Sequence, residues 1–123
     1  MQKLEPYVKI VIISEEQNVC KWLKIISNTA ISNEIPNAQF KINGNAFLKI
    51  LEHHKQSIID FYNAELSTDD IFNLCQIKIV MDNRLYEFKF NYENVDLLNF
   101  ANILYQDFKY LIDVCSVNYE DIE

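Results

Sequence analysis

The residues of this chain that are best suited to acid–base or metal chemistry are two adjacent histidines, His53 and His54. Imidazole changes charge near neutral pH, and Glu52 and Asp60 lie in the same segment, so a histidine–carboxylate pair for proton transfer is possible. Neighbouring residues of a helix point about 100° apart, so the two rings cannot hold one metal ion from the same side. The sequence therefore favours a structural His54 near the core and an exposed His53, and it predicts no metal site.

The common cofactor and hydrolase motifs are missing from the sequence. Loops that hold phosphate groups need several glycines, and this chain has only Gly44. No serine lies in a Gly-x-Ser-x-Gly motif. The cysteines Cys20, Cys75 and Cys115 are widely spaced in apolar surroundings, which predicts reduced, buried thiols. We therefore expect no cofactor and no enzymatic activity.

A second group of residues with functional potential lies near the C-terminus. Six residues mix carboxylates with large apolar groups at spacings of four, three, four, three and four, which places them in one line along a helix. They are Asp96, Phe100, Ile103, Asp107, Tyr110 and Val114. This line is either the margin of the core or a surface on which aromatic anchors are surrounded by charges that match a basic partner. The residues that would extend such a partner-binding surface are Tyr105, Asp113, Tyr119, Glu120 and Asp121.

These residues require a long helix to position them, and the sequence predicts one over 95–115. The segment contains an apolar stripe at helical spacing, made of Leu97, Ala101, Leu104, Phe108, Leu111 and Cys115. Asn94 is a favourable N-cap residue, and Asp96 lies in the first turn, where the helix dipole stabilises an acid. The stripe needs a sheet to cover it. Residues 117–123 are predicted to form a short acidic tail.

Residues 75–92 are predicted to form a β-hairpin with Asp82 and Asn83 as its two-residue turn. The expected pairs are Val80 with Leu85, Ile79 with Tyr86, Lys78 with Glu87 and Ile77 with Phe88. This register places apolar side chains on one side of the hairpin and polar ones on the other, with a cross-strand ion pair. A shift by one residue would expose several aromatic rings to water, so we expect this register to be well determined.

The N-terminal third is expected to contain one strand and one helix. The β-branched run Tyr7–Ser14 predicts a central strand of the sheet. A capping-box pattern that begins at Ser14, followed by apolar residues at helical spacing, predicts a helix that ends near Ser27. The polar residues 27–37 are interpreted as a connecting loop.

The segment after this loop has two interpretations. In the favoured one, Asn45 caps a helix that continues to about residue 62. In the other, residues 39–42 form a strand and Asn43 and Gly44 form a hairpin turn. Because a hairpin is present and no regular alternation of strands and helices appears, we predict one α+β domain over 1–123, with helices on one face of a mostly antiparallel sheet.

The net charge of −7 is unevenly distributed along the chain. Residues 1–81 contain nine acidic and eight basic residues, whereas residues 82–123 contain nine acidic and three basic residues. An acidic surface repels phosphate backbones and anionic membranes, and it speeds encounters with a basic partner. We therefore expect no nucleic acid and no membrane as partner. The sequence has no signal peptide and no apolar run that spans a membrane, which predicts a cytoplasmic protein.

In size, acidity and general composition, the chain resembles the small bacterial immunity proteins that neutralise contact-dependent growth inhibition toxins and other polymorphic toxins. This resemblance implies a stoichiometric inhibitor that binds a cognate toxin, often a basic nuclease, and blocks its active site or substrate path. Three alternatives stay open. The first is an inhibitor that mimics nucleic acid towards a defence complex. The second is a small enzyme that uses His53 or His54, and the third is an oligomeric structural protein.

Overall fold

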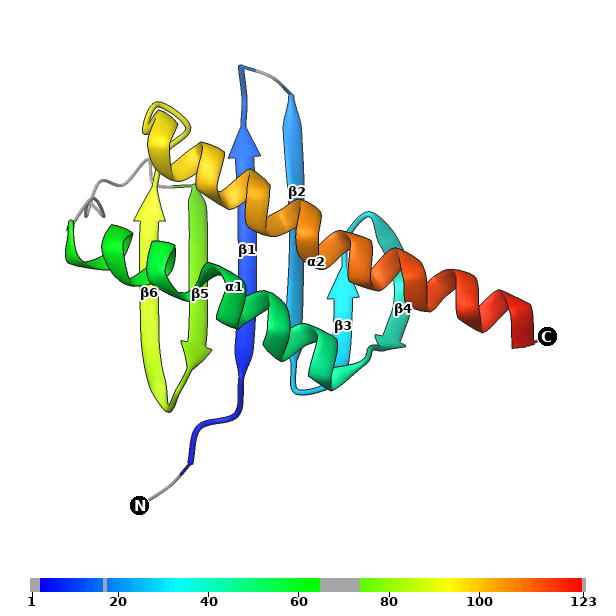
Figure 1. Ribbon diagram of the computed structural model, residues 1–123. Coiled ribbons are helices and arrows are strands. Elements are labelled where there is room, and N and C mark those ends of the chain that lie inside the picture. Colours follow the sequence, from blue (N-terminus) through cyan, green and yellow to red (C-terminus); the bar gives the residue numbers. More distant parts are fainter. Residues whose placement is uncertain (1–2, 17, 65–73, 123) are drawn as a thin grey trace.

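The computed structural model describes residues 3–16, 18–64 and 74–122, except for the side chains of residues 35–38, 40 and 115–122. Six strands form one antiparallel sheet in the order β4-β3-β2-β1-β5-β6, and both helices lie on the same face of it (Figure 1). The strands are β1 (Tyr7–Ser14), β2 (Val19–Ile26), β3 (Thr29–Ser32), β4 (Ile35–Lys41), β5 (Cys75–Met81) and β6 (Arg84–Phe90), and the helices are α1 (Gly44–Asn63) and α2 (Val95–Ile122). The predicted α+β class is confirmed. Among the described residues, neither helix is long and apolar enough to cross a membrane.

The first strand, β1, lies in the interior of the sheet between β2 and β5, as its continuous hydrophobicity predicts. Val8, Ile10 and Ile12 point towards the helices and are almost completely buried. The alternate side chains point away from the helices and are only half-buried. The sheet therefore has one covered face and one open face.

Residues 14–27 do not form the predicted helix. They form the β1–β2 turn and the strand β2, in which Leu23 and Ile25 are buried against the helices while Lys24 is exposed. The acidic residues expected to begin a helix lie in the turn, where the N–H of Asn18 bonds to the carbonyl of Glu15 at 3.2 Å. The apolar spacing of this segment fits both a helix and a strand, and pairing with β1 decides for the strand.

The predicted loop over 27–37 was also wrong, because it contains β3 and the beginning of β4. Its polar residues serve the strands. The side-chain oxygen of Asn33 accepts a hydrogen bond from the Trp22 N–H at 2.7 Å, and its amide donates to the Cys20 carbonyl at 3.1 Å. Asn33 therefore satisfies backbone groups of β2 beside the turn that follows β3.

The helix α1 forms as favoured, but its N-cap is Asn43 rather than Asn45. The side-chain oxygen of Asn43 accepts hydrogen bonds from the backbone N–H groups of Asn45 at 2.9 Å and Ala46 at 3.2 Å. Its buried stripe is Phe47, Leu51, His54 and Ile58. The strand of the alternative interpretation is present as well, because β4 ends at Lys41, directly before the cap.

The strands β5 and β6 pair in the register that the sequence pattern predicts, with Ile77 opposite Phe88 and Ile79 opposite Tyr86. Both turn residues, Asp82 and Asn83, have positive φ, at 51° and 61°. These values match a type I′ turn, whose twist fits the twist of the strands. The hairpin brings Tyr86, Phe88 and Phe90 under the helices as part of the core.

The second helix, α2, begins at Val95 and continues to Ile122, so the predicted end at residue 115 was too early. Asn94 accepts a hydrogen bond from the N–H of Leu97 at 3.2 Å, as expected of an N-cap. Of the cysteines, Cys75 is buried as predicted, whereas Cys20 is exposed on the open face of the sheet, because residue 20 belongs to a strand and points outward. The side chain of Cys115 lies outside the described part of the chain.

Candidate partner-binding surface

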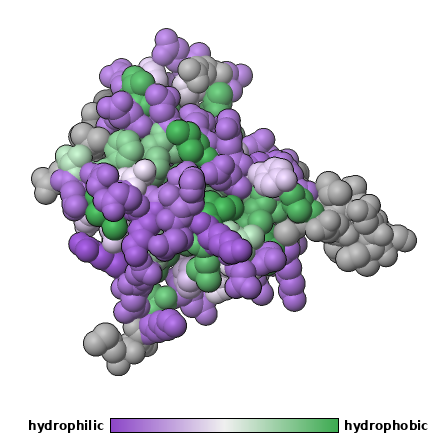
Figure 2. Space-filling view, viewed as in Figure 1, coloured by the Kyte–Doolittle hydropathy of each residue, from purple (hydrophilic) through white to green (hydrophobic). Residues whose placement is uncertain are grey.

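The outer side of α2 presents three large apolar side chains to solvent. Ile103 is 51% exposed, Tyr110 71% and Val114 36%. Together with Asp107 they occupy one line along the helix, and we call these four residues the α2 ridge. Figure 2 views the helical face and shows apolar areas in its middle and beside the C-terminal end of α2, bordered by hydrophilic residues. A monomeric protein needs a reason to keep such a line exposed.

Asp107 is joined to α1 through His54. The His54 Nε2 atom lies 2.6 Å from Asp107 Oδ2, in a contact between residues 53 positions apart in the sequence. His54 is only 8% exposed and packs edge-on against the ring of Phe100 at 6.4 Å. The Asp107 side chain stays 45% exposed. The contact therefore ties the two helices together and holds a carboxylate at the surface in a fixed orientation.

The pair formed by His54 and Asp107 revives the question of catalysis, since a carboxylate that orients a histidine is common in active sites. Here the imidazole nitrogen that is bonded to the carboxylate belongs to a buried ring. A cavity lies between the N-terminal segment, α1 and the β5–β6 turn, and neither His54 nor Asp107 lines it. The arrangement suits a structural link between helices better than proton transfer to a substrate.

Two residues of the predicted line do not join the ridge. Phe100 is 5% exposed and stacks on Phe61 with ring centroids 4.7 Å apart, so it belongs to the core and is not an anchor for a partner. Asp96 is exposed, but it is 11 positions before Asp107, which separates the two residues by about 16 Å along the helix axis. The interpretation of the line as a core margin therefore holds for Phe100, and the partner-binding interpretation can apply only from Ile103 onward.

Tyr105, which was expected to extend the surface, is also buried. Its hydroxyl donates a hydrogen bond to the carboxylate of Glu34 in the turn between β3 and β4, and Lys21 Nζ lies 4.7 Å from its ring centroid. Burial, and then the bond to Glu34, raises the pKa of the Tyr105 phenol above its ordinary value. Tyr105 therefore fastens α2 to the edge of the sheet.

Of the four other residues predicted to extend the surface, the structure describes the side chain of Asp113 alone. Asp113 is exposed and forms an ion pair with Lys109, one helical turn earlier, at 2.7 Å. This contact neutralises part of its charge in solution. Tyr119, Glu120 and Asp121 lie within α2, but their side chains are outside the described part of the chain.

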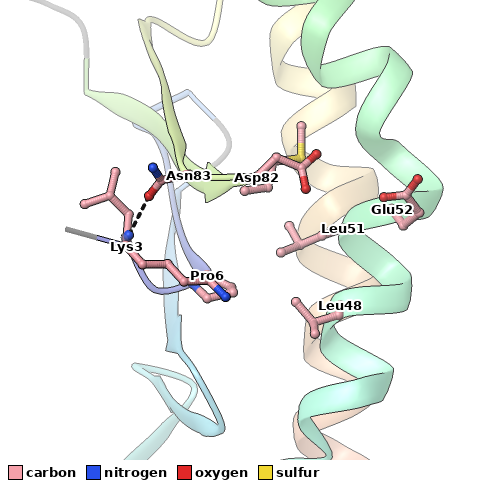
Figure 3. A pocket seen from close by; sticks show the side chains of 9 residues that line it. Lys3, Pro6, Leu48, Leu51, Glu52, Asp82 and Asn83 are labelled. Atoms are coloured by element: carbon pink, nitrogen blue, oxygen red, sulfur yellow. Dashed lines mark hydrogen bonds between the residues drawn. The ribbon is translucent and has the colours of Figure 1, made fainter. Parts of the chain in front are cut away.

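A cavity of about 310 Å³ lies at the opposite end of the molecule from the C-terminus, between the N-terminal segment, α1 and the β5–β6 turn (Figure 3). Leu48 and Leu51 of α1 face the segment around Pro6 across it. The N–H of Leu4 donates to Asn83 Oδ1 at 2.6 Å and closes one side. Its polar lining residues are Lys3, Glu52, Asp82 and Asn83, and this set contains no histidine, serine or cysteine. No sequence signal pointed to this cavity, because its walls come from three separate segments.

No protein-family model, no curated protein and no solved structure matches this chain. The function must be argued from these surfaces. Sequence reasoning found the α2 ridge, because its members share one helical period. It missed the partner of His54, because a contact over 53 positions leaves no periodic signal.

Proposed function

We propose that this chain is an immunity protein that binds a cognate bacterial toxin with a basic surface and blocks the toxin's active site or substrate path. The observation that carries the proposal is the α2 ridge. A tyrosine that is 71% exposed between Ile103 and Val114 provides the aromatic and apolar anchors typical of interface hot spots. The carboxylate of Asp107 lies within this line, where it can accept a hydrogen bond from a lysine or arginine of the toxin.

The fixed position of Asp107 supports a binding role. Because His54 already holds one carboxylate oxygen, the side chain loses little conformational freedom when a partner binds. Preorganised charged groups of this kind contribute to specificity and to the rate of encounter. The adjacent Asp113 can exchange its contact with Lys109 for one with the partner.

The charge at the end of α2 also supports a basic partner. The helix dipole disfavours acids near a C-terminus, yet α2 has no basic residue in its last turn and its sequence there contains Glu120 and Asp121. These acids add negative charge to the segment that follows the ridge, and basic groups of a partner would match that charge.

The experiment is a calorimetric titration of the purified chain against the product of the neighbouring gene at low and high salt. We expect a one-to-one complex whose association slows as salt rises. Tyr110→Ala should weaken binding about tenfold or more, in line with the loss of a hot-spot residue. Asp107→Asn should weaken it and reduce its salt dependence.

The control is Leu85→Ala, which removes another large exposed side chain, 44% accessible, from the open face of the sheet. Binding should be unchanged in this variant. Absence of a complex, or equal effects of Leu85→Ala and Tyr110→Ala, would contradict the proposal.

A further inference from the structure

The face of the sheet that points away from the helices is open. In the part of the chain that the structure describes, no helix or strand covers it (Figure 1). Two large apolar side chains on this face, Ile26 and Leu85, are 43% and 44% exposed. This face lies on the opposite side of the molecule from the α2 ridge, so it is a separate surface.

Three lysines stand side by side on this open face. Lys9 of β1 is directly opposite Lys24 of β2 and also directly opposite Lys78 of β5. Strands lie about 4.8 Å apart, so this lysine row places three positive charges on consecutive strands. Like charges in directly opposite positions destabilise a sheet, and the sequence keeps two such pairs in succession.

The rest of the open face is also positive. Lys41 is opposite Thr29, and Lys89 is opposite Gln76, and both point to the same side as the lysine row. Among the outward strand positions that the structure describes, Glu87 has the one carboxylate. It accepts a hydrogen bond from Gln76 Nε2 at 3.2 Å. The acidic total of the chain, −7, is therefore reversed in sign over this face.

Apolar and aromatic side chains flank the lysine row on both sides. One flank is the cross-strand row Ile26, Tyr7, Val80 and Leu85. On the other flank, Trp22 is directly opposite Val11. Both aromatic side chains are half-buried, and Lys24 Nζ lies 5.9 Å from the Tyr7 ring centroid. The face thus combines a line of cations with aromatic surface on either side.

We propose that the open face of the sheet binds single-stranded nucleic acid, although the net charge of −7 led us to expect no nucleic-acid partner, because the local charge of this face is positive. The lysine row contacts consecutive phosphates, and bases stack on Trp22 and Tyr7, which is the combination that single-strand binding surfaces use. A duplex keeps its base faces hidden, so it cannot use the aromatic flanks. An acidic peptide matches the lysines, but its acidic residues have no aromatic rings to stack on those flanks. A second copy of the chain, stacked face to face, would bring two lysine rows together.

The probe is a fluorescently labelled twelve-nucleotide oligothymidine, followed by anisotropy, with Trp22 as an internal reporter. Trp22 is the only tryptophan of the chain, so all of the tryptophan fluorescence reports on this position, and a base that stacks on Trp22 should quench it. We expect quenching that accompanies the rise in anisotropy. Affinity should fall with salt, with a log–log slope of about −2 or steeper if three or more phosphates are contacted.

The test variants are Lys9→Gln and Lys78→Gln, and the matched control is Lys49→Gln, on the exposed surface of α1. Each test variant should weaken binding about threefold to tenfold at low salt and make the salt slope shallower by about 0.7. The control should bind like the parent chain. Lys9→Gln removes repulsion between neighbouring lysines, so this variant should fold at least as well as the parent chain. Lys78→Gln removes one repulsion and also the charge opposite Glu87, so its stability should change little. A thermal melt checks both variants.

Several outcomes would overturn the proposal. One is no binding of oligothymidine at 20 mM salt. A second is that the oligonucleotide binds without quenching Trp22 and is displaced by poly-glutamate. This result would mean that the face binds any polyanion. A third is that Lys9→Gln makes the chain self-associate in sedimentation while the parent chain binds no oligonucleotide, which would mean that the lysines only keep copies apart. None of these outcomes affects the proposal for the α2 ridge, which lies on the other side of the molecule.

Discussion

The contact between His54 and Asp107 combines two roles in one pair of residues. His54 is buried between the helices, and its ring nitrogen lies 2.6 Å from a carboxylate oxygen that is still accessible to a partner. A buried imidazole without this partner would lose hydrogen bonding that water supplies in the unfolded chain. The pair therefore stabilises the fold and also fixes the one acidic group of the α2 ridge.

The first prediction concerns the stability that this contact provides. His54→Ala should lower the free energy of unfolding by about 2 kcal/mol, because it removes both a buried ring and a hydrogen bond. His53→Ala, the control at the neighbouring exposed position, should change it by less than about 0.5 kcal/mol. Urea unfolding measures both values. Similar losses in the two variants would show that His54 is not the link between the helices.

The second prediction concerns alkaline pH. The pKa of the Tyr105 phenol is raised by burial and by Glu34, so the folded state keeps this proton to higher pH than the unfolded chain, whose phenols titrate near 10. The contribution of Tyr105 is therefore complete below pH 10 and is lost as pH rises through the raised folded-state pKa. The free energy of unfolding should fall above pH 10, by at most about 1.4 kcal/mol per pH unit for this group.

Tyr105→Phe tests this pH dependence by urea unfolding between pH 8 and 11. The variant should be less stable at pH 8, because the hydrogen bond to Glu34 is lost, and its stability should fall less steeply above pH 10. A residual decline is expected, because burial also raises the pKa of Tyr7 and of the Cys75 thiol. Tyr110→Phe, at an exposed position, should keep the slope of the parent chain. An unchanged slope in Tyr105→Phe would contradict the assignment.

At the scale of the element, α2 serves two different surfaces with one helical repeat. Leu104 and Phe108 are fully buried against the sheet, while Ile103 and Tyr110, next to them in sequence, are exposed. The helix covers β1 and reaches β4 at its C-terminal half (Figure 1). The residues that stabilise the fold and the residues that we propose to bind a partner therefore lie on different faces of the same helix.

The third prediction separates these two faces. Leu104→Ala should destabilise the fold by about 2–5 kcal/mol, because it leaves a cavity at a position with no solvent access. Ile103→Ala should change stability by less than about 0.5 kcal/mol. In the titration with the toxin, Ile103→Ala should nevertheless weaken binding. If Ile103→Ala were as destabilising as Leu104→Ala, the ridge would be part of the core.

At the scale of the whole molecule, the fold separates charges that are mixed along the chain. Lys9, Lys24 and Lys78 point to the open face of the sheet, whereas Lys21 contacts the Tyr105 ring of α2 and the acids of α2 lie on the helical side. The average charge of −7 therefore describes neither face. Because the two proposed binding surfaces lie on opposite sides of the sheet, their two proposed partners would not compete for the same site.

The fourth prediction is that the two faces act independently. The double variant Tyr110→Ala with Lys9→Gln should lose toxin affinity as Tyr110→Ala does and oligonucleotide affinity as Lys9→Gln does. The free-energy changes caused by substitutions at distant sites without shared contacts usually add to within about 0.5 kcal/mol. Anisotropy of the labelled oligonucleotide in the presence of saturating toxin measures this directly. Displacement of the oligonucleotide by the toxin would show that the two surfaces overlap.

Local patterns in the sequence determined the elements whose signals have a single interpretation. Alternation and a turn of Asp82 and Asn83 specify the register of the β5–β6 hairpin, and an uninterrupted period of apolar residues specifies α2 and the line that contains its ridge. The strand β1 follows from its β-branched run. In each case, the residues that decide the structure are neighbours in the chain.

Tertiary structure alone decided the rest, because the deciding contacts join distant residues. The segment that became β2 has apolar spacing compatible with a helix or a strand, and the hydrogen bonds offered by β1 favour the strand. The contact of His54 with Asp107, the burial of Phe100 by Phe61, and the lysine row across three strands depend on the arrangement of separate elements. A helical or strand period states which way a side chain points, but only packing determines what it meets there.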